Sequence, residues 1–112
     1  MIQAIKLSVY PVKDLEHAKA LYTKLLGVAP YADSPYYVGF KVGDHEVGLD
    51  PNAHRKGITG PLEYWQVADI QQAVKAFVEA GATLQEDVKD VGGGKLIATI
   101  KDADGNLIGL AQ

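Results

Sequence analysis

The sequence contains no cysteine, one methionine and one tryptophan, and its net charge is only −3. The absence of cysteine excludes disulfide bonds, thiolate catalysis and cysteine-ligated zinc. No apolar run approaches the roughly 20 residues of a membrane-spanning helix, and the chain enters a strand-like pattern at its amino terminus. Without a basic surplus, nothing favours nucleic acid or an anionic membrane as a partner. We therefore expect one small cytoplasmic domain that binds neither.

The first half of the chain predicts a strand followed by a helix. Apolar and polar residues alternate over residues 2–10, which is typical of a half-buried strand ending at Pro11. Asp14 is suited to cap a helix that Gly27 ends. The residues expected to form one buried helical stripe are Leu15, Ala18, Leu21, Tyr22, Leu25 and Leu26.

The next segments predict a loop over residues 28–35 and strands over residues 36–42 and 46–49, joined at Gly43-Asp44. Residues 51–60 lack periodicity, so we interpret them as a linker. It separates a first module, residues 1–50, from a second, residues 61–112.

The second module repeats this order. A strand over residues 62–67 leads to Asp69, a second N-cap with Gln72 three residues later. Gly81 ends this helix, and strands are expected over residues 82–84, 96–101 and 107–110. The predicted buried stripe consists of Ile70, Ala73, Val74, Phe77 and Val78.

Two short segments match between the modules: Val47-Gly48-Leu49 and Ile108-Gly109-Leu110 each follow a polar turn. Together with the matching helix ends, they indicate an internal duplication. The predicted class is α+β, with duplicated βαβββ modules that form a curved mixed sheet. Helices with one apolar stripe would cover one face of the sheet and leave an open trough on the other.

The chain resembles the vicinal oxygen chelate superfamily, which includes glyoxalase I, the bleomycin resistance proteins and extradiol dioxygenases. The resemblance covers nearly the whole chain. It is carried by Val12-Lys-Asp-Leu-Glu, Leu25-Leu26-Gly27, Val67-Ala-Asp-Ile and Asp102-Ala-Asp-Gly-Asn-Leu-Ile. It implies the same fold, and either a metal held in the trough or a metal-free binding site there.

The resemblance places the four metal-ligand positions of the family at Leu7, Gly48, Leu62 and Gly109. Lys6 or Ser8 replaces Leu7 if Pro11 shifts the strand register, and Asp50 is a distant alternative to Gly48. Aliphatic side chains and glycine cannot ligate a divalent cation. We therefore expect no metal, no cofactor and no catalytic residues.

A trough floor with two glycines has room for a ligand, although each glycine can equally relieve local crowding. Tyr64 and Gln66 should share the face of Leu62, with Trp65 and Val67 under the second helix. The predicted ligand-binding residues are Leu7, Tyr37, Gly39, Gly48, Leu62, Tyr64, Gln66 and Gly109. His17 and His45 are expected to be exposed.

The sequence thus predicts a metal-free protein that binds a small apolar or aromatic molecule, as bleomycin resistance relatives do. One alternative is a metal-dependent lyase, isomerase or dioxygenase that uses Glu46, Asp50, Glu63 or His54. Another is a non-catalytic subunit. A homodimer is expected because a small open sheet leaves apolar surface to bury.

Overall fold

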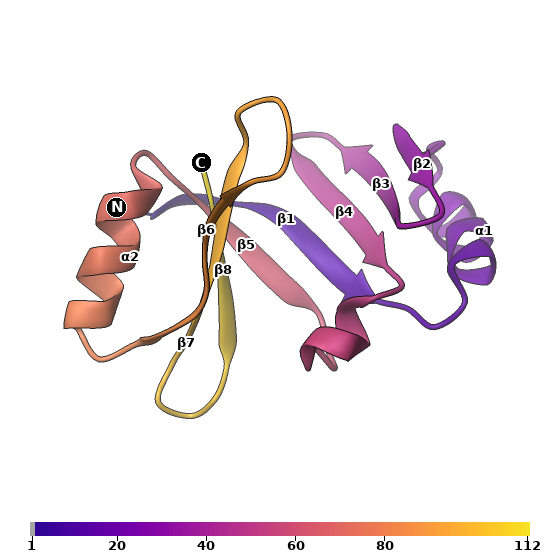
Figure 1. Ribbon diagram of the computed structural model, residues 1–112. Coiled ribbons are helices and arrows are strands. Elements are labelled where there is room, and N and C mark those ends of the chain that lie inside the picture. The colour runs from indigo at the N-terminus through magenta and orange to yellow at the C-terminus, as the bar shows by residue number, and fades with distance from the viewer. Residues whose placement is uncertain (1) are drawn as a thin grey trace. The chain divides into compact units, whose positions relative to one another are not determined.

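A computed structural model describes residues 2–112 and places eight strands and two α-helices in the order βαβββ, twice (Figure 1). The first set comprises β1 (Ile2–Pro11), α1 (Leu15–Leu26), β2 (Ala32–Ser34), β3 (Tyr37–Val42) and β4 (His45–Asp50). The second comprises β5 (Leu62–Val67), α2 (Ile70–Glu79), β6 (Thr83–Asp90), β7 (Leu96–Lys101) and β8 (Leu107–Ala111). The predicted class, α+β with mixed strand directions, is confirmed.

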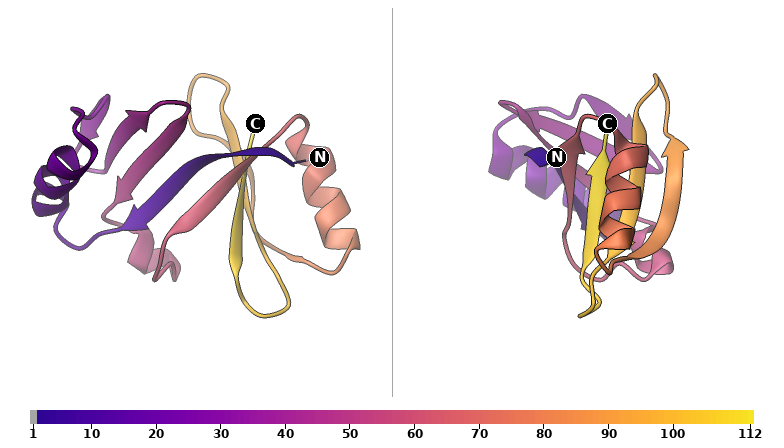
Figure 2. Two further views of the ribbon diagram at one scale, coloured as in Figure 1. Left: turned by 180° about the vertical axis from the view of Figure 1, so that it is seen from behind. Right: turned by 90° about the vertical axis from the view of Figure 1, so that its left-hand side faces the viewer.

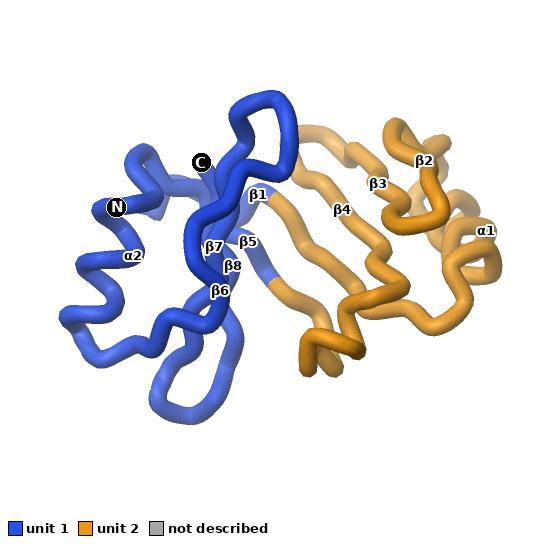
Figure 3. Tube along the Cα trace, in the orientation of Figure 1, with its two compact units in different colours: residues 1–6, 63–112 blue, residues 7–62 orange. Residues whose placement is uncertain are grey.

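The chain divides into two compact units, coloured separately in Figure 3. Residues 7–62 form the first unit, and residues 63–112 with residues 2–6 form the second. Residues 2–6 thus group with the second unit, whereas the predicted first module included them. The predicted linker contains a 3₁₀ helix (Ala53–Lys56), whose Ala53 is fully buried.

The first unit has the strand order β2-β3-β4-β1, with β1 parallel to β4 and the other pairs antiparallel. Helix α1 begins where the Asp14 carboxylate accepts a hydrogen bond from the backbone N–H of His17. It ends at Gly27, whose φ of 72° suits glycine. Both predicted ends of α1 are confirmed.

The helix α1 covers one face of its strands only in part. Its contact with the core of Val38, Phe40 and Leu49 is made by Ala18, with Leu15, Tyr22 and Leu26 packed beside it. Leu21 and Leu25 are 55% and 70% exposed, so the prediction that they belong to the buried stripe is wrong. The apolar positions span more of the helix circumference than the sheet covers.

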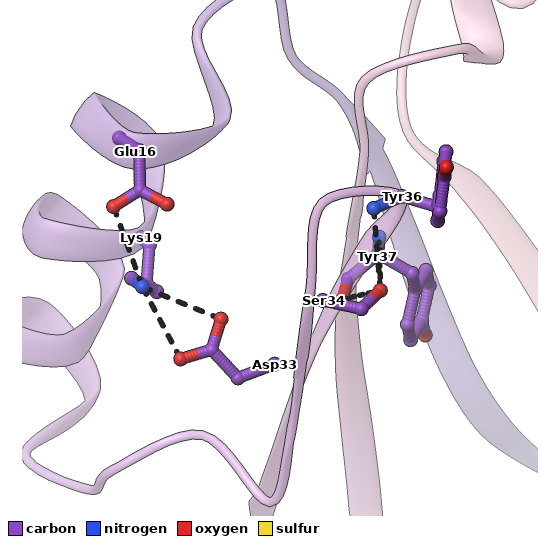
Figure 4. A network of polar contacts seen from close by, with 6 residues as sticks. All are labelled: Glu16, Lys19, Asp33, Ser34, Tyr36 and Tyr37. Carbon is purple, nitrogen blue, oxygen red and sulfur yellow. Dashed lines mark hydrogen bonds and ion pairs between the residues drawn. The ribbon is translucent and has the colours of Figure 1, made fainter.

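The segment after α1 returns to the sheet as β2, an edge strand within the residues predicted as a loop. Its Asp33 accepts from Lys19 Nζ at 3.2 and 3.3 Å, while Glu16 lies 3.3 Å from the same ammonium (Figure 4). The Ser34 hydroxyl closes the following turn by accepting from the backbone N–H of Tyr37 at 3.1 Å. Polar side chains, which carry no periodic signal, therefore hold this short strand beside α1.

The second unit has the strand order β5-β8-β7-β6, with β5 parallel to β8. Helix α2 lies along one face of these strands (Figure 2). Asp69 caps it by accepting from the Gln72 N–H, as predicted. The core under α2 consists of Val67, Ile70, Ala73, Val74, Ala98, Ile100 and Leu110, with Trp65 and Phe77 packed against it. Val78, predicted to be buried, is 42% exposed, and β6 is longer than the expected three residues.

Candidate functional site

The helix-free face of the first unit carries a pair of glycines directly opposite each other. Gly39 on β3 is the cross-strand partner of Gly48 on β4, and both are buried. Side chains alternate along a strand, and those of the core residues Val38, Phe40, Val47 and Leu49 face α1. The two glycines therefore expose bare backbone on the opposite face.

A tyrosine from the same strand pair covers Gly48. A Cβ built on Gly48 would lie 2.1 Å from the Tyr37 hydroxyl oxygen and 2.6 Å from the ring carbon Cζ. Such distances are far below van der Waals contact, so only glycine admits the ring in this position. Gly48 therefore relieves local crowding, which was one of the two interpretations of the glycines. The ring that would otherwise clash belongs to Tyr37, a predicted site residue.

A second tyrosine, Tyr31, covers Gly39 in the same way. Its ring lies 3.0 Å from the position of a Cβ on Gly39, and its hydroxyl donates a hydrogen bond to the Glu46 carboxylate. Partial burial, followed by this bond, raises the pKa of Tyr31 well above its usual value. Tyr31 was not among the predicted site residues, because its only local signal is that of an aromatic residue in a proline-bounded loop.

The second unit repeats the arrangement with a different strand. Gly109 on β8 is aligned with Tyr64 on β5 and with Thr99 on β7. A Cβ on Gly109 would lie 2.5 Å from Cδ1 of the Tyr64 ring. Tyr64 is 9% exposed, and Gln66, two residues along β5, shares its face. Trp65 packs against the core under α2, as predicted.

The aliphatic residues at the other two family positions are buried, with Leu7 at 7% and Leu62 at 2% exposed. Leu7 is aligned with Glu46 in the parallel β1–β4 pair. A metal that the fold family implies would need several nitrogen, oxygen or sulfur donors at about 2 Å. Leu7, Gly48, Leu62 and Gly109 supply no side-chain donor, and residues 2–112 contain no group of three His, Asp or Glu side chains that could hold a metal ion. The residues at these positions do not fit the metal.

One histidine is not placed as the sequence suggested. His45 is half-buried, and its Nε2 lies 2.8 Å from the hydroxyl oxygen of Ser8 on β1. The expectation that His45 is exposed is therefore wrong, because β1 runs parallel to β4 and brings Ser8 beside it. His17 and His54 are exposed.

A groove of about 340 Å³ lies beside the start of α2. It is lined by Val67, Ala68, Asp69, Gln72, Ala73 and Ala76. The first backbone N–H groups of the helix are already taken, since Ile70 donates to the Gln112 side chain and Gln72 to Asp69. The groove therefore lacks free helix-end donors at these two positions.

Comparison with known proteins gives one family match. A family model described as Glyoxalase/Bleomycin resistance protein/Dioxygenase superfamily matches residues 4–110. No curated protein sequence matches this chain significantly. Neither helix within residues 2–112 has the length and apolar character needed to cross a membrane.

Solved structures with low sequence identity share the fold. Methylmalonyl-CoA epimerase from Mycobacterium tuberculosis has a TM-score of 0.78 and 19% identity, covering 98% of this chain and 87% of its own. A glyoxalase/bleomycin resistance protein/dioxygenase superfamily member from Vibrio splendidus 12B01 has a TM-score of 0.73 and 16% identity, covering 100% and 99%. The Mn(II)-bound glyoxalase from Novosphingobium aromaticivorans has a TM-score of 0.73 and 22% identity, covering 98% of this chain and 38% of its own.

Proposed function

Because this chain belongs to the glyoxalase/bleomycin resistance protein/dioxygenase superfamily, we propose that it binds a small apolar or aromatic molecule without a divalent metal. One observation carries the proposal. Gly48 and Gly109, where relatives would place metal-ligating carboxylates, each have a tyrosine ring lying against bare backbone. The pattern occurs once in each unit, and in the first unit the rings of Tyr31 and Tyr37 remain at least partly exposed, so they offer aromatic surface where a metal would need donors.

These helix-free faces have the composition of a small-molecule site. Ligand pockets are mostly apolar, with a few polar groups that fix orientation. In the first unit, the Tyr31 and Tyr37 hydroxyls lie over the two glycines, and the Tyr31 hydroxyl donates to the Glu46 carboxylate. In the second unit, Tyr64 and Gln66 share a face with Gly109. We propose that aromatic stacking supplies most of the affinity and that these polar groups select the ligand.

Thermal unfolding with a panel of aromatic metabolites and antibiotics tests the proposal. A ligand that binds only the folded protein at 100 times its Kd stabilises it by about 2.7 kcal/mol, which raises the midpoint measurably. We expect at least one aromatic compound to do so, with the midpoint unchanged by a chelator. If a broad panel leaves the midpoint where it was, the proposal falls and a non-catalytic subunit becomes the better interpretation.

The alternative is a metal-dependent lyase, isomerase or dioxygenase, and a methylmalonyl-CoA epimerase and an Mn(II)-bound glyoxalase share this fold. The hydrogen bond from Tyr31 to Glu46 favours it, because a carboxylate beside a phenol can transfer a proton. Elemental analysis of protein purified without chelator separates the two functions. Stoichiometric iron, zinc, manganese or nickel would defeat the metal-free proposal.

We also propose that the protein is a homodimer, since a chain of 112 residues buries a smaller share of its surface than a larger domain. Light scattering across a concentration series measures the mass directly. A mass near 12.0 kDa at all concentrations would contradict the dimer without affecting the ligand proposal.

A further inference from the structure

We propose that, when no ligand is bound, the Tyr31 side chain occupies a subsite that binds a phenolic ligand. The ring of the ligand would replace the Tyr31 ring on Gly39, and its hydroxyl would replace the Tyr31 hydroxyl at Glu46. The inference rests on the proposed function and names its ligand class: an aryl ring carrying a hydroxyl group. The subsite lies entirely within the first unit.

The shape of the subsite follows from the glycine pair. Cζ, Cε1 and the hydroxyl oxygen of Tyr31 lie 3.0–3.1 Å from the position of a Cβ on Gly39. The end of a phenol ring is therefore already fitted to the Gly39 backbone. The cross-strand partner of Gly39 is Gly48, which the Tyr37 ring covers. A surface that accepts one phenol closely will accept another of the same shape.

The chemistry of the subsite follows from Glu46. Its carboxylate accepts a hydrogen bond from the Tyr31 hydroxyl, and hydrogen bonds to a charged acceptor are stronger than neutral ones. A phenolic ligand would donate the same bond, whereas a ring without a hydroxyl cannot. A site that hydrogen-bonds a hydroxyl discriminates strongly against the analogue that lacks it.

The Tyr31 side chain is placed so that it can leave without unfolding the unit. It is 55% exposed and precedes the edge strand β2. Its backbone N–H donates to the Gly39 carbonyl at 2.9 Å, and this bond does not depend on the side-chain rotamer. Rotation of the side chain therefore uncovers Gly39 and Glu46 while the main chain stays in register.

The test compares wild-type protein with Tyr31→Ala, using 4-methylphenol and toluene as probes and titration calorimetry or NMR shifts as the readout. Removing the internal competitor removes the cost of displacing it, so Tyr31→Ala should bind 4-methylphenol about tenfold or more tightly than wild type. Toluene should bind this variant more weakly than 4-methylphenol does. Adding Glu46→Leu to Tyr31→Ala should abolish the difference between the two probes.

Two variants control the test. Tyr36→Ala removes a nearby tyrosine that is 74% exposed and does not lie on the glycine pair. This variant should therefore bind 4-methylphenol with the same affinity as wild type. Tyr31→Ser opens the subsite with a different residue and should reproduce Tyr31→Ala, provided each variant shows a cooperative unfolding transition.

The outcomes separate this inference from the proposed function. If aromatic compounds bind wild type and both Tyr31 variants equally, the phenol subsite is wrong and the binding function stands. Equal affinities of the Tyr31→Ala variant for 4-methylphenol and toluene would also overturn it. If no aromatic compound binds any of the proteins, both proposals fall.

Discussion

The two units are built from the same elements, yet they differ in how their helices are buried. Helix α2 contributes Ile70, Ala73 and Val74 to its core, and Ile70 is fully buried. Helix α1 contributes one buried residue, Ala18, and it leaves Leu25 70% exposed. Equal helical periodicity in the sequence therefore does not imply equal burial.

The units also cover their equivalent glycines by different routes. Tyr64 reaches Gly109 from the parallel strand β5, whereas Tyr37 reaches Gly48 from the antiparallel strand β3. On β1, Val9 is aligned with Gly48 as Tyr64 is with Gly109. The first unit adds Tyr31, whose phenol donates a hydrogen bond to the Glu46 carboxylate. The glycine face is thus covered by a buried tyrosine in the second unit, Tyr64 at 9% exposed, whereas Tyr31 in the first unit is 55% exposed.

The largest predicted difference in the loss of stability on mutation is between helices α2 and α1. Ile70→Ala removes a fully buried side chain and should lower the free energy of unfolding by about 2–5 kcal/mol. Leu25→Ala removes an exposed one and should change it by less than about 0.5 kcal/mol. Urea unfolding at neutral pH measures both. Similar losses for the two variants would show that Leu25 is covered in solution.

The next largest predicted difference in the loss of stability is between Gly109 and Gly48. Gly109→Ala should lower the free energy of unfolding by about 1–3 kcal/mol, because its Cβ would lie 2.5 Å from Tyr64 ring atoms close to that residue's backbone. Gly48→Ala should cost less, because the obstructing atoms are at the far end of Tyr37, which can rotate away. The same unfolding measurement compares them, and a greater loss for Gly48→Ala would reverse this ranking.

A smaller effect concerns Tyr31 at alkaline pH. Its folded-state pKa is raised, so it contributes stability below its ordinary pKa near 10 that is lost as pH rises through the folded value. Tyr31→Phe should weaken folding by the low end of roughly 0.5–1.5 kcal/mol for a hydrogen bond and remove one late-titrating phenol. Unfolding measured between pH 8 and about 11 checks the stability, and absorbance titration over the same range should count equal numbers of titrating phenols in wild type and Tyr31→Phe, because Tyr31 ionises above this range. One phenol fewer in the variant would contradict the assignment.

The smallest effect concerns the turn of the second unit. The Asp102 carboxylate accepts from the Asn106 side chain and from the backbone N–H groups of Asn106 and Asp104, which lowers its pKa. Its contribution to stability is present above the ordinary carboxyl pKa and is lost as pH falls through the lowered value. Asp102→Asn should therefore reduce stability slightly at neutral pH and flatten the acid limb of the stability curve. A variant with an unchanged acid limb would rule out this contribution.

Much of the fold could be predicted because its signals are local. The caps Asp14 and Asp69 bond to N–H groups three residues away, and strand alternation placed Trp65 under α2 and Tyr64 on the other face. Part of the candidate site followed from the same alternation, since Tyr64 and Gln66 lie on one face of β5. Whether these residues bind a ligand stays a prediction.

What the sequence determined by itself was the order of the elements other than β2, the capped starts of the helices and the faces of the central strands, because these depend on neighbours a few residues apart. Only the tertiary structure decided which tyrosine covers which glycine, that Tyr31 meets Glu46, and that Ser8 lies beside His45. Those contacts join segments 15 and 37 residues apart. They depend on how a loop returns to its sheet and on strand pairing, which no local pattern specifies.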